Sequence, residues 1–200
     1  MKKFELTDEF VTNVFGHKLF RIKALVAFGD VEKGELGGFI EKEDNLSHDD
    51  NAWVYGNAWV SGNAQVSGNA WVFGNAQVFG NAQVFDNAWV FDNAWVYGNA
   101  RVSGNAWVSG NAQVFGDADY AVVAGFGRYF RTTTFFRCKD KILRVQCGCF
   151  YGDLAQFREI VKKTHGDSKY AKEYLAIADL MELHFSDKCG GEQMNDGKIY

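Results

Sequence analysis

The 200-residue sequence contains no proline and only four histidines and four cysteines. Proline cannot donate a backbone hydrogen bond, so its absence suits an extensive β-ladder in which every backbone N–H is needed. The N-terminal segment MKKFELTDEF lacks the apolar core of a signal peptide, and no long apolar run follows it. These absences predict a soluble cytoplasmic protein without membrane association, whose cysteines are thiols.

Charge is also sparse and unevenly distributed. The net charge of −4 argues against a chain that binds nucleic acid over its whole surface. Residues 1–50 carry about −4, residues 51–119 about −3, and residues 120–200 about +3. Any contact with a polyanion is therefore expected in the C-terminal part.

Between Asn51 and Gly116, the hexapeptide Asn-Ala-x-Val-y-Gly is repeated eleven times with almost no variation. Such a short period is the signature of a β-solenoid. Side chains alternate along a strand, so Ala and Val point to one side while x and y point to the other. The following Gly-Asn or Asp-Asn tolerates the positive φ of a sharp bend. No helical stretch separates these strands, which excludes an ordinary βαβ fold.

The simplest closed coil with a valine-filled interior has three sides and about 18 residues. Eleven hexapeptides then give nearly four coils, stacked as parallel strands roughly 4.8 Å apart. Asparagines at the corners are expected to form ladders of side-chain amides. Ile40 and Leu46 are six residues apart and start the coils as degenerate rungs. Two extra residues bulge out within Ser47–Asp50.

A period of 18 sorts the outward positions into columns, and all six tryptophans fall into them. Large contiguous apolar patches usually mark interfaces, and Trp and Tyr dominate interface energetics. The alternative is that aromatic ladders only stabilise the stacked strands. The predicted partner- or self-binding residues are Trp53, Tyr55, Trp71, Phe73, Trp89, Phe91 and Trp107 on the first side, and Trp59, Trp95 and Tyr97 on the second.

Three regions are predicted. Residues 1–50 form an N-terminal β cap with the first degenerate rungs, including a strand over 17–28 that pairs with 4–6. Residues 51–125 form the solenoid, with 117–125 as its last degenerate rung. Residues 126–200 form a small ββαα domain.

In this third region, strands at 128–138 and 142–150 make a hairpin. A first helix is capped by Asp153, with Gln156 completing a capping box, and ends at Gly166. A second helix runs to about Phe185, and the tail from Ser186 is polar.

Basic and aromatic residues alternate in the predicted hairpin, a combination that can contact single-stranded nucleic acid. The same pattern also fits a hairpin with one core face and one charged face. The candidate basic contact patch consists of Arg128, Arg131, Arg137, Lys139, Lys141 and Arg144.

The residues that could support chemistry are few. Cys147 and Cys149, with Cys138 and Cys189, have a looser spacing than a zinc site, and in a strand the first two would share a face as small hydrophobes. No metal or cofactor is therefore predicted. His48 lies beside Asp49 and Asp50, where it is either a general base oriented by a carboxylate or a solvated loop residue. No catalytic residue is assigned.

The pattern V-x-G-N-A-x resembles the hexapeptide repeat of left-handed β-helix proteins. The run GNAxVxGNAxV, preceded by GELGGFIEKEDNLS and followed by CGCFYGDLAQFREIVKKTHGDSKYAKEYL, resembles phage- and prophage-encoded hexapeptide-repeat proteins without a settled activity. More distant relatives are bacterial hexapeptide acyltransferases. That kinship would imply a histidine base between subunits and an acyl carrier bound along the coils. Here His17, His48, His165 and His184 all lie outside the repeats, which argues against a transferase.

The predicted fold class is mainly β: a left-handed parallel β-helix with three hexapeptides per coil, an N-terminal β cap and a C-terminal ββαα domain. The predicted function is non-catalytic binding by rigid aromatic faces, through a homo-oligomer and a host protein target. A counter-defence or host-takeover inhibitor is the most concrete version, and it rests on the phage resemblance. The alternatives are an acyltransferase-like enzyme or its inactive remnant, and a structural or assembly scaffold.

Overall fold

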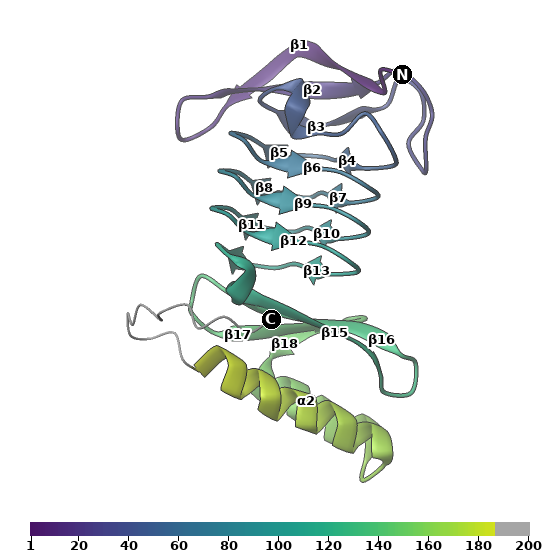
Figure 1. The fold of residues 1–200 in the computed structure, drawn as a ribbon, viewed down its shortest axis with the longest axis vertical. Helices are drawn as coiled ribbons and strands as arrows, with labels where there is room; N and C mark the ends of the chain where they lie inside the picture. Colours follow the sequence, from purple (N-terminus) through teal and green to yellow (C-terminus); the bar gives the residue numbers. More distant parts are fainter. Residues whose placement is uncertain (187–200) are drawn as a thin grey trace, which may run out of the picture.

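The computed structural model describes residues 1–186 and forms a column in which a β-solenoid lies between an N-terminal cap and a C-terminal domain (Figure 1). Each hexapeptide contributes one short strand, and the strands form three parallel stacks. The first side holds β4 (Trp53–Val54), β7 (Trp71–Val72), β10 (Trp89–Val90) and β13 (Trp107–Val108). The second side holds β5 (Trp59–Val60), β8 (Gln77–Val78), β11 (Trp95–Val96) and β14 (Gln113–Val114). The third side holds β6 (Gln65–Val66), β9 (Gln83–Val84) and β12 (Arg101–Val102).

The register confirms a coil of three hexapeptides. Trp89 pairs with Trp71 above it and with Trp107 below it. Backbone N–H groups donate to carbonyls of the next coil, as from Trp71 to Ala88 at 3.0 Å. All frame alanines and valines from Ala52 to Val114 are fully buried, so the interior is the same on every side.

The corners follow the predicted chemistry. The asparagine side chains form amide ladders along the column, as from Asn51 Nδ2 to Asn69 Oδ1 at 3.0 Å. Where aspartate replaces glycine, Asp86 and Asp92 adopt φ of 58° and 60°. Their carboxylates accept the backbone N–H of Gly104 and Gly110 one coil further on. The aspartates thus offset the strain of a positive φ with a hydrogen bond to the next corner.

The N-terminal cap continues the second side of the solenoid. The strands β1 (Phe4–Thr12), β2 (Lys18–Ala24) and β3 (Leu36–Ile40) extend that sheet in the order β1-β2-β3-β5. Ile40 pairs with Val60 and Leu46 with Val66, which confirms both degenerate rungs and the two inserted residues. The short 3₁₀ helix η1 (Glu43–Asn45) connects these two rungs. A Cβ at Gly38 would lie 2.5 Å from the carbonyl of Ala58, so the cap backbone lies directly on the first coil.

The ammonium of Lys3 fastens this cap from inside. Lys3 is buried, and its Nζ donates to the carbonyls of Ala52 at 2.9 Å and Asp49 at 3.3 Å. Burial lowers the pKa of Lys3 from its ordinary 10.5 to about 8, against the attraction of Asp50 and Asp49. The unfolded chain therefore binds more protons than the folded chain between these two pH values.

We expect the free energy of unfolding to rise between pH 7 and pH 9 through the Lys3 contribution, by about 1 kcal/mol. Urea unfolding at several pH values measures it, with Lys3→Met as the reference that lacks the titrating group. The difference between the two chains should shift in favour of the parent as pH rises. A difference that is constant or falls with pH contradicts the lowered pKa.

The C-terminal domain is a four-stranded antiparallel sheet with two helices. Its elements are β15 (Tyr120–Phe126), β16 (Arg131–Arg137), β17 (Leu143–Cys147), β18 (Phe150–Asp153), α1 (Leu154–His165) and α2 (Lys169–Ser186). The hairpin around Lys139–Lys141 and both helices are confirmed, as is the capping box of Asp153 and Gln156. The ββαα prediction missed two strands. The predicted tail beyond Ser186 lies outside the described residues.

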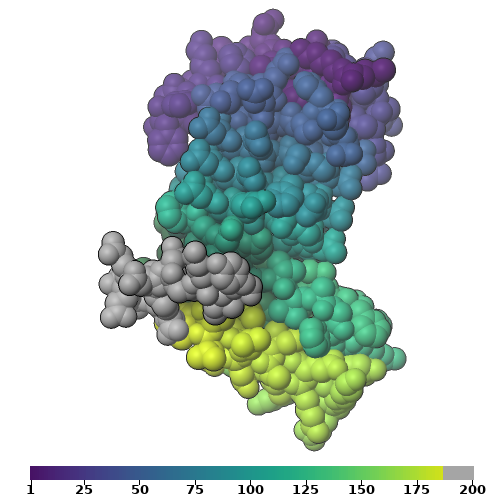
Figure 2. Space-filling model, in the orientation of Figure 1, coloured from purple at the N-terminus to yellow at the C-terminus, as the bar shows by residue number. Residues whose placement is uncertain are grey.

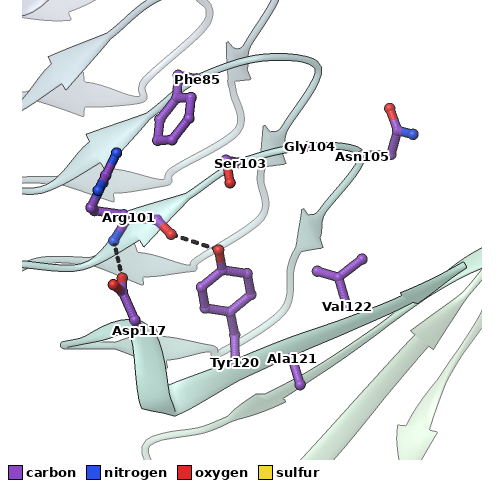
Figure 3. Close-up of a pocket in the computed structure, with 9 residues that line it drawn as sticks. All are labelled: Phe85, Arg101, Ser103, Gly104, Asn105, Asp117, Tyr120, Ala121 and Val122. Atoms are coloured by element: carbon purple, nitrogen blue, oxygen red, sulfur yellow. Dashed lines mark hydrogen bonds between the residues drawn. The ribbon is translucent and has the colours of Figure 1, made fainter. Parts of the chain in front are cut away.

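The prediction that residues 117–125 form a last rung of the solenoid is wrong. The 3₁₀ helix η2 (Asp117–Asp119) leaves the solenoid, and β15 pairs antiparallel with β16. Below the third side, side chains provide the hydrogen bonds that a further coil would otherwise form with β12. Asp117 Oδ1 accepts the N–H of Arg101 at 2.8 Å, and the Tyr120 hydroxyl donates to the Arg101 carbonyl (Figure 3). The edge is thus satisfied without a further parallel strand.

The sheet closes the lower end of the other two sides. β16 lies against β13 and β14, and Phe136 joins the hydrophobic core of the solenoid. The backbone N–H of Trp107 donates to the Thr134 hydroxyl at 3.0 Å. Within residues 1–186, no helix is long and apolar enough to cross a membrane.

Candidate functional site: the aromatic side of the solenoid

The first side of the solenoid carries two parallel ladders of rings. The indoles of Trp71 and Trp89 stack with centroids 5.8 Å apart, and those of Trp89 and Trp107 stack at 5.1 Å with planes 4° apart. Beside them, Phe73 and Phe91 stack at 5.0 Å. The ladders form because identical side chains recur one coil apart, at the spacing of neighbouring strands.

This surface, called the aromatic side below, is partly exposed, and each of its rings has an intermediate exposure. Its rings cover one another's faces but leave their outer edges uncovered. Its upper part is a shallow apolar hollow of about 530 Å³, which also includes Asp30 from the cap. The members of the aromatic side are Tyr55, Trp71, Phe73, Trp89, Phe91 and Trp107.

Polar ladders border the aromatic side at both corners. On one corner Asn69 donates to Asn87, and on the other Asn75 donates to Asn93. The third side of the solenoid is polar by contrast, with Gln65 and Arg101 exposed. The arrangement is an apolar strip within a polar border on a rigid support.

The prediction of an exposed Trp53 is wrong. Trp53 is fully buried, although its position in the repeat is an outward one. Phe28 lies 5.3 Å and Phe4 6.2 Å from its ring, because the cap folds over the top of the first side. Tyr55, which follows in the same coil, stays partly exposed, and burial raises its pKa to about 12. The repeat gives no signal of this cover, which comes from residues about 25 and 50 positions earlier in the sequence.

The second side is a less continuous surface. Phe79 and Tyr97 stack at 5.1 Å, and Phe79 also contacts Trp59 and Trp95. Glutamines alternate with the two tryptophans along this column. Phe15, at the tip of the β1–β2 hairpin, lies 5.9 Å from Phe79 and covers part of the surface. The cap therefore already uses some of the second side.

The structure separates the predicted basic patch into two groups. Arg128 and Arg131 lie near the β15–β16 turn, with both guanidinium groups close to the Tyr129 ring. The other members lie at the far end of β16, about 20 Å away at roughly 3.3 Å per residue. At that end Arg137 donates to the Phe185 carbonyl, and Arg144 pairs with Asp140 at 2.7 Å. Lys139 and Lys141 lie in the connecting turn.

The cysteines have three different environments. Cys138 is buried, and burial raises its pKa to about 11. Cys147 accepts a hydrogen bond from the Thr133 hydroxyl at 3.1 Å. The expectation that Cys147 and Cys149 share a strand face is wrong, since β17 ends at Cys147 and Cys149 lies exposed in the next turn. Cys189 lies outside the described residues. Within residues 1–186, no three His, Cys, Asp or Glu side chains form a group that could hold a metal.

The histidine that sequence placed beside two aspartates has a structural role. His48 Nδ1 accepts the backbone N–H of Lys3 at 3.1 Å, and its ring stacks on Phe4 at 4.3 Å. Its Nε2 lies 3.6 Å from Glu43 Oε2. His48 thus holds the first residues of the chain to the bulge of the first coil.

The repeats of this chain are similar to a known family of repeats. A family model described as the YdcK beta solenoid repeat matches residues 64–80, 82–98 and 94–110. These segments lie entirely within the coils, so the similarity agrees with the β-solenoid fold and does not extend to the cap or the C-terminal domain. A comparison with curated proteins gave no match.

Proposed function

We propose that this chain is a non-catalytic binding protein whose aromatic side docks against another protein surface, in the first instance a second copy of itself. The observation that supports this is the double ladder of partly exposed rings along one side of the solenoid. Trp and Tyr are the residues most enriched among those that dominate binding energy. The apolar strip between amide ladders has the anatomy of an interface, with an apolar centre and a polar rim.

The support beneath the rings favours binding further. The strands of the aromatic side are hydrogen-bonded coil to coil, and their inward valines are fully buried. Preorganised side chains lose little conformational freedom when a partner covers them, which leaves more of the burial energy for affinity. A symmetric dimer would place two like strips against each other, since a two-fold interface uses the same patch on both subunits.

A narrower version follows from the resemblance to phage-encoded repeat proteins. In it, the aromatic side or the C-terminal domain occludes a protein of the host cytoplasm, as a counter-defence or host-takeover inhibitor. The acyltransferase alternative receives no support from the eleven repeats, which contain no histidine. Titration calorimetry with acetyl-CoA distinguishes the acyltransferase alternative from the binding protein, because saturable binding of acetyl-CoA would favour the enzyme or its remnant. The scaffold alternative predicts self-association without a host target.

The test replaces two rings at the centre of the aromatic side. We expect the double substitution Trp71→Ser and Trp89→Ser to lower the self-association constant at least 100-fold, because central aromatic residues contribute about 2 kcal/mol or more each. Light scattering coupled to gel filtration measures the mass, and pull-down from a bacterial lysate tests for a host partner. The loss of ring pairs should cost about 1–3 kcal/mol of stability without unfolding the chain.

The matched control is Gln65→Ser with Gln83→Ser on the polar third side, at equivalent positions of the repeat. This variant should keep the mass and partners of the parent. If the tryptophan double variant is folded and also keeps both, the aromatic side is not the docking surface.

A further inference from the structure

We propose that the junction between the aromatic side and the C-terminal sheet binds a planar aromatic anion of the chemistry of a nucleoside monophosphate. The C-terminal sheet projects sideways below the column of coils, forming a step (Figure 2). A hollow of about 670 Å³ lies between the lower coils and the sheet, lined among others by Trp89, Trp107, Arg131, Thr132, Asn105 and Cys149. This volume is within the range of small-molecule sites.

The ring stack ends at this hollow. Trp89 covers one face of the Trp107 indole at 5.1 Å, and Phe91 contacts it edge-on. Within residues 1–186, no further ring or cation stacks on its other face. An indole at the end of a stack can accept one more planar group, and bases of any sequence stack on such rings. The hollow therefore lies at the lower end of the ladder, where both Trp89 and Trp107 line it and a planar group can contact the indoles.

A positive charge stands beside that position. Arg131 is exposed and forms no ion pair within the described chain, and its guanidinium lies 5.0 Å from the Tyr129 ring centroid. Gly148 provides the space for it, because a Cβ there would lie 2.6 Å from Arg131 Nη1. None of the described residues that line the hollow is acidic. A guanidinium without a carboxylate partner favours phosphate, which it can bind with two parallel hydrogen bonds.

The remaining lining groups fit the rest of such a ligand. Thr132 and Asn105 offer hydroxyl and amide groups that can hydrogen-bond to a ribose or a base edge. The indole stacks on the base and the guanidinium binds the phosphate, so both parts of the ligand are needed. This site shares Trp89 and Trp107 with the aromatic side but does not depend on self-association.

The test uses adenosine 5′-monophosphate, adenosine and inorganic phosphate as probes of the full chain. Binding is followed by quenching of tryptophan fluorescence and by protection of the exposed Cys149 from iodoacetamide, mapped by peptide mass spectrometry. We expect the monophosphate to quench and protect, adenosine to bind at least tenfold more weakly, and phosphate alone to do neither. An oligomer of deoxyadenosine binding more than tenfold tighter than the monophosphate would identify single-stranded nucleic acid as the source of the same chemistry.

Variants separate the two halves of the site. Arg131→Gln should lower the affinity for the monophosphate at least tenfold and leave the affinity for adenosine and the oligomer mass unchanged. Trp107→Leu should weaken both ligands, whereas Trp95→Leu on the second side should weaken neither. If 10 mM monophosphate neither quenches nor protects, or if Arg131→Gln binds it as tightly as the parent, the proposal is wrong.

Discussion

Replacing Val84 with aspartate is expected to abolish the folded state at 25 °C. Val84 is fully buried and lies in register between Val66 and Val102. A carboxylate there has no cation or donor among the surrounding alanines and valines, and an uncompensated buried charge costs roughly 4–5 kcal/mol or more. That is comparable to the whole stability of a typical domain, about 5–15 kcal/mol.

The neighbouring residue supplies the control. Gln83 lies in the same strand with its side chain outward, next to Arg101 in the column. Gln83→Asp should therefore change the free energy of unfolding by less than about 1 kcal/mol. Val84→Ala removes volume but adds no charge. It should lower the free energy of unfolding by about 2 kcal/mol, between the effects of Gln83→Asp and Val84→Asp.

Circular dichroism during urea and thermal unfolding measures these differences. The loss of unfolding free energy in Val84→Asp, relative to the parent chain, should become smaller as the pH falls toward 4. A buried carboxyl has a raised pKa, and its neutral form is tolerated better than its charged form. A Val84→Asp chain that unfolds at the same urea concentration as Gln83→Asp would show that the valines do not fill the interior.

This contrast explains which parts of the fold could be predicted. Inward Ala and Val alternate with outward residues in every hexapeptide. Because this alternation is so strict, the position of each strand, the position of each corner and the length of a coil follow from local geometry alone. The capping box at Asp153 and the stop at Gly166 are likewise local signals, and the structure places α1 between them. Each of these features depends on residues a few positions apart.

The features that were missed depend on distant residues. Trp53 has the same repeat context as Trp71, and only the folding of Phe4 and Phe28 over it makes it a core residue. The side chains of Asp117 and Tyr120 form hydrogen bonds with the backbone N–H and carbonyl groups at the edge of β12. A prediction that the rungs simply continue does not include these contacts. The hollow at Trp107 and Arg131 joins a coil to the end of the β15–β16 hairpin, 24 positions later. No periodic pattern contains such a contact.

Removing one hexapeptide, residues 69–74, should leave the chain folded and abolish self-association through the aromatic side. The interior is the same on every side, so Gly68 joined to Asn75 continues the valine core. The strand β3 keeps its pairing with β5, and the C-terminal sheet keeps its contacts with the last strands, whereas the contact of Phe15 with Phe79 is lost. The outward residues after the deletion rotate by one side. Gln77 then follows Trp53 on the first side, while Trp89 and Trp107 move to the third.

The deletion thus rearranges the outer surface and removes only Ala70 and Val72 from the interior, where every side carries the same two residue types. Duplication of residues 69–86 is the control, because it inserts a whole coil, keeps every column in place and lengthens the aromatic side. In a solenoid, stability is roughly a sum over neighbouring units, so the shorter chain should melt slightly below the parent and the longer one slightly above. Gel filtration with light scattering should show a monomer for the deletion and the parental oligomer for the duplication.

The two outcomes that would contradict this reasoning are distinct. A deletion variant that fails to fold would mean that the three sides of the interior are not equivalent, and the geometric account of the coil would be wrong. A folded deletion variant with the parental mass would mean that association does not need the rings in their rows. Only a folded monomer fits both the valine-filled coil and a docking surface that depends on the alignment of Trp71, Trp89 and Trp107.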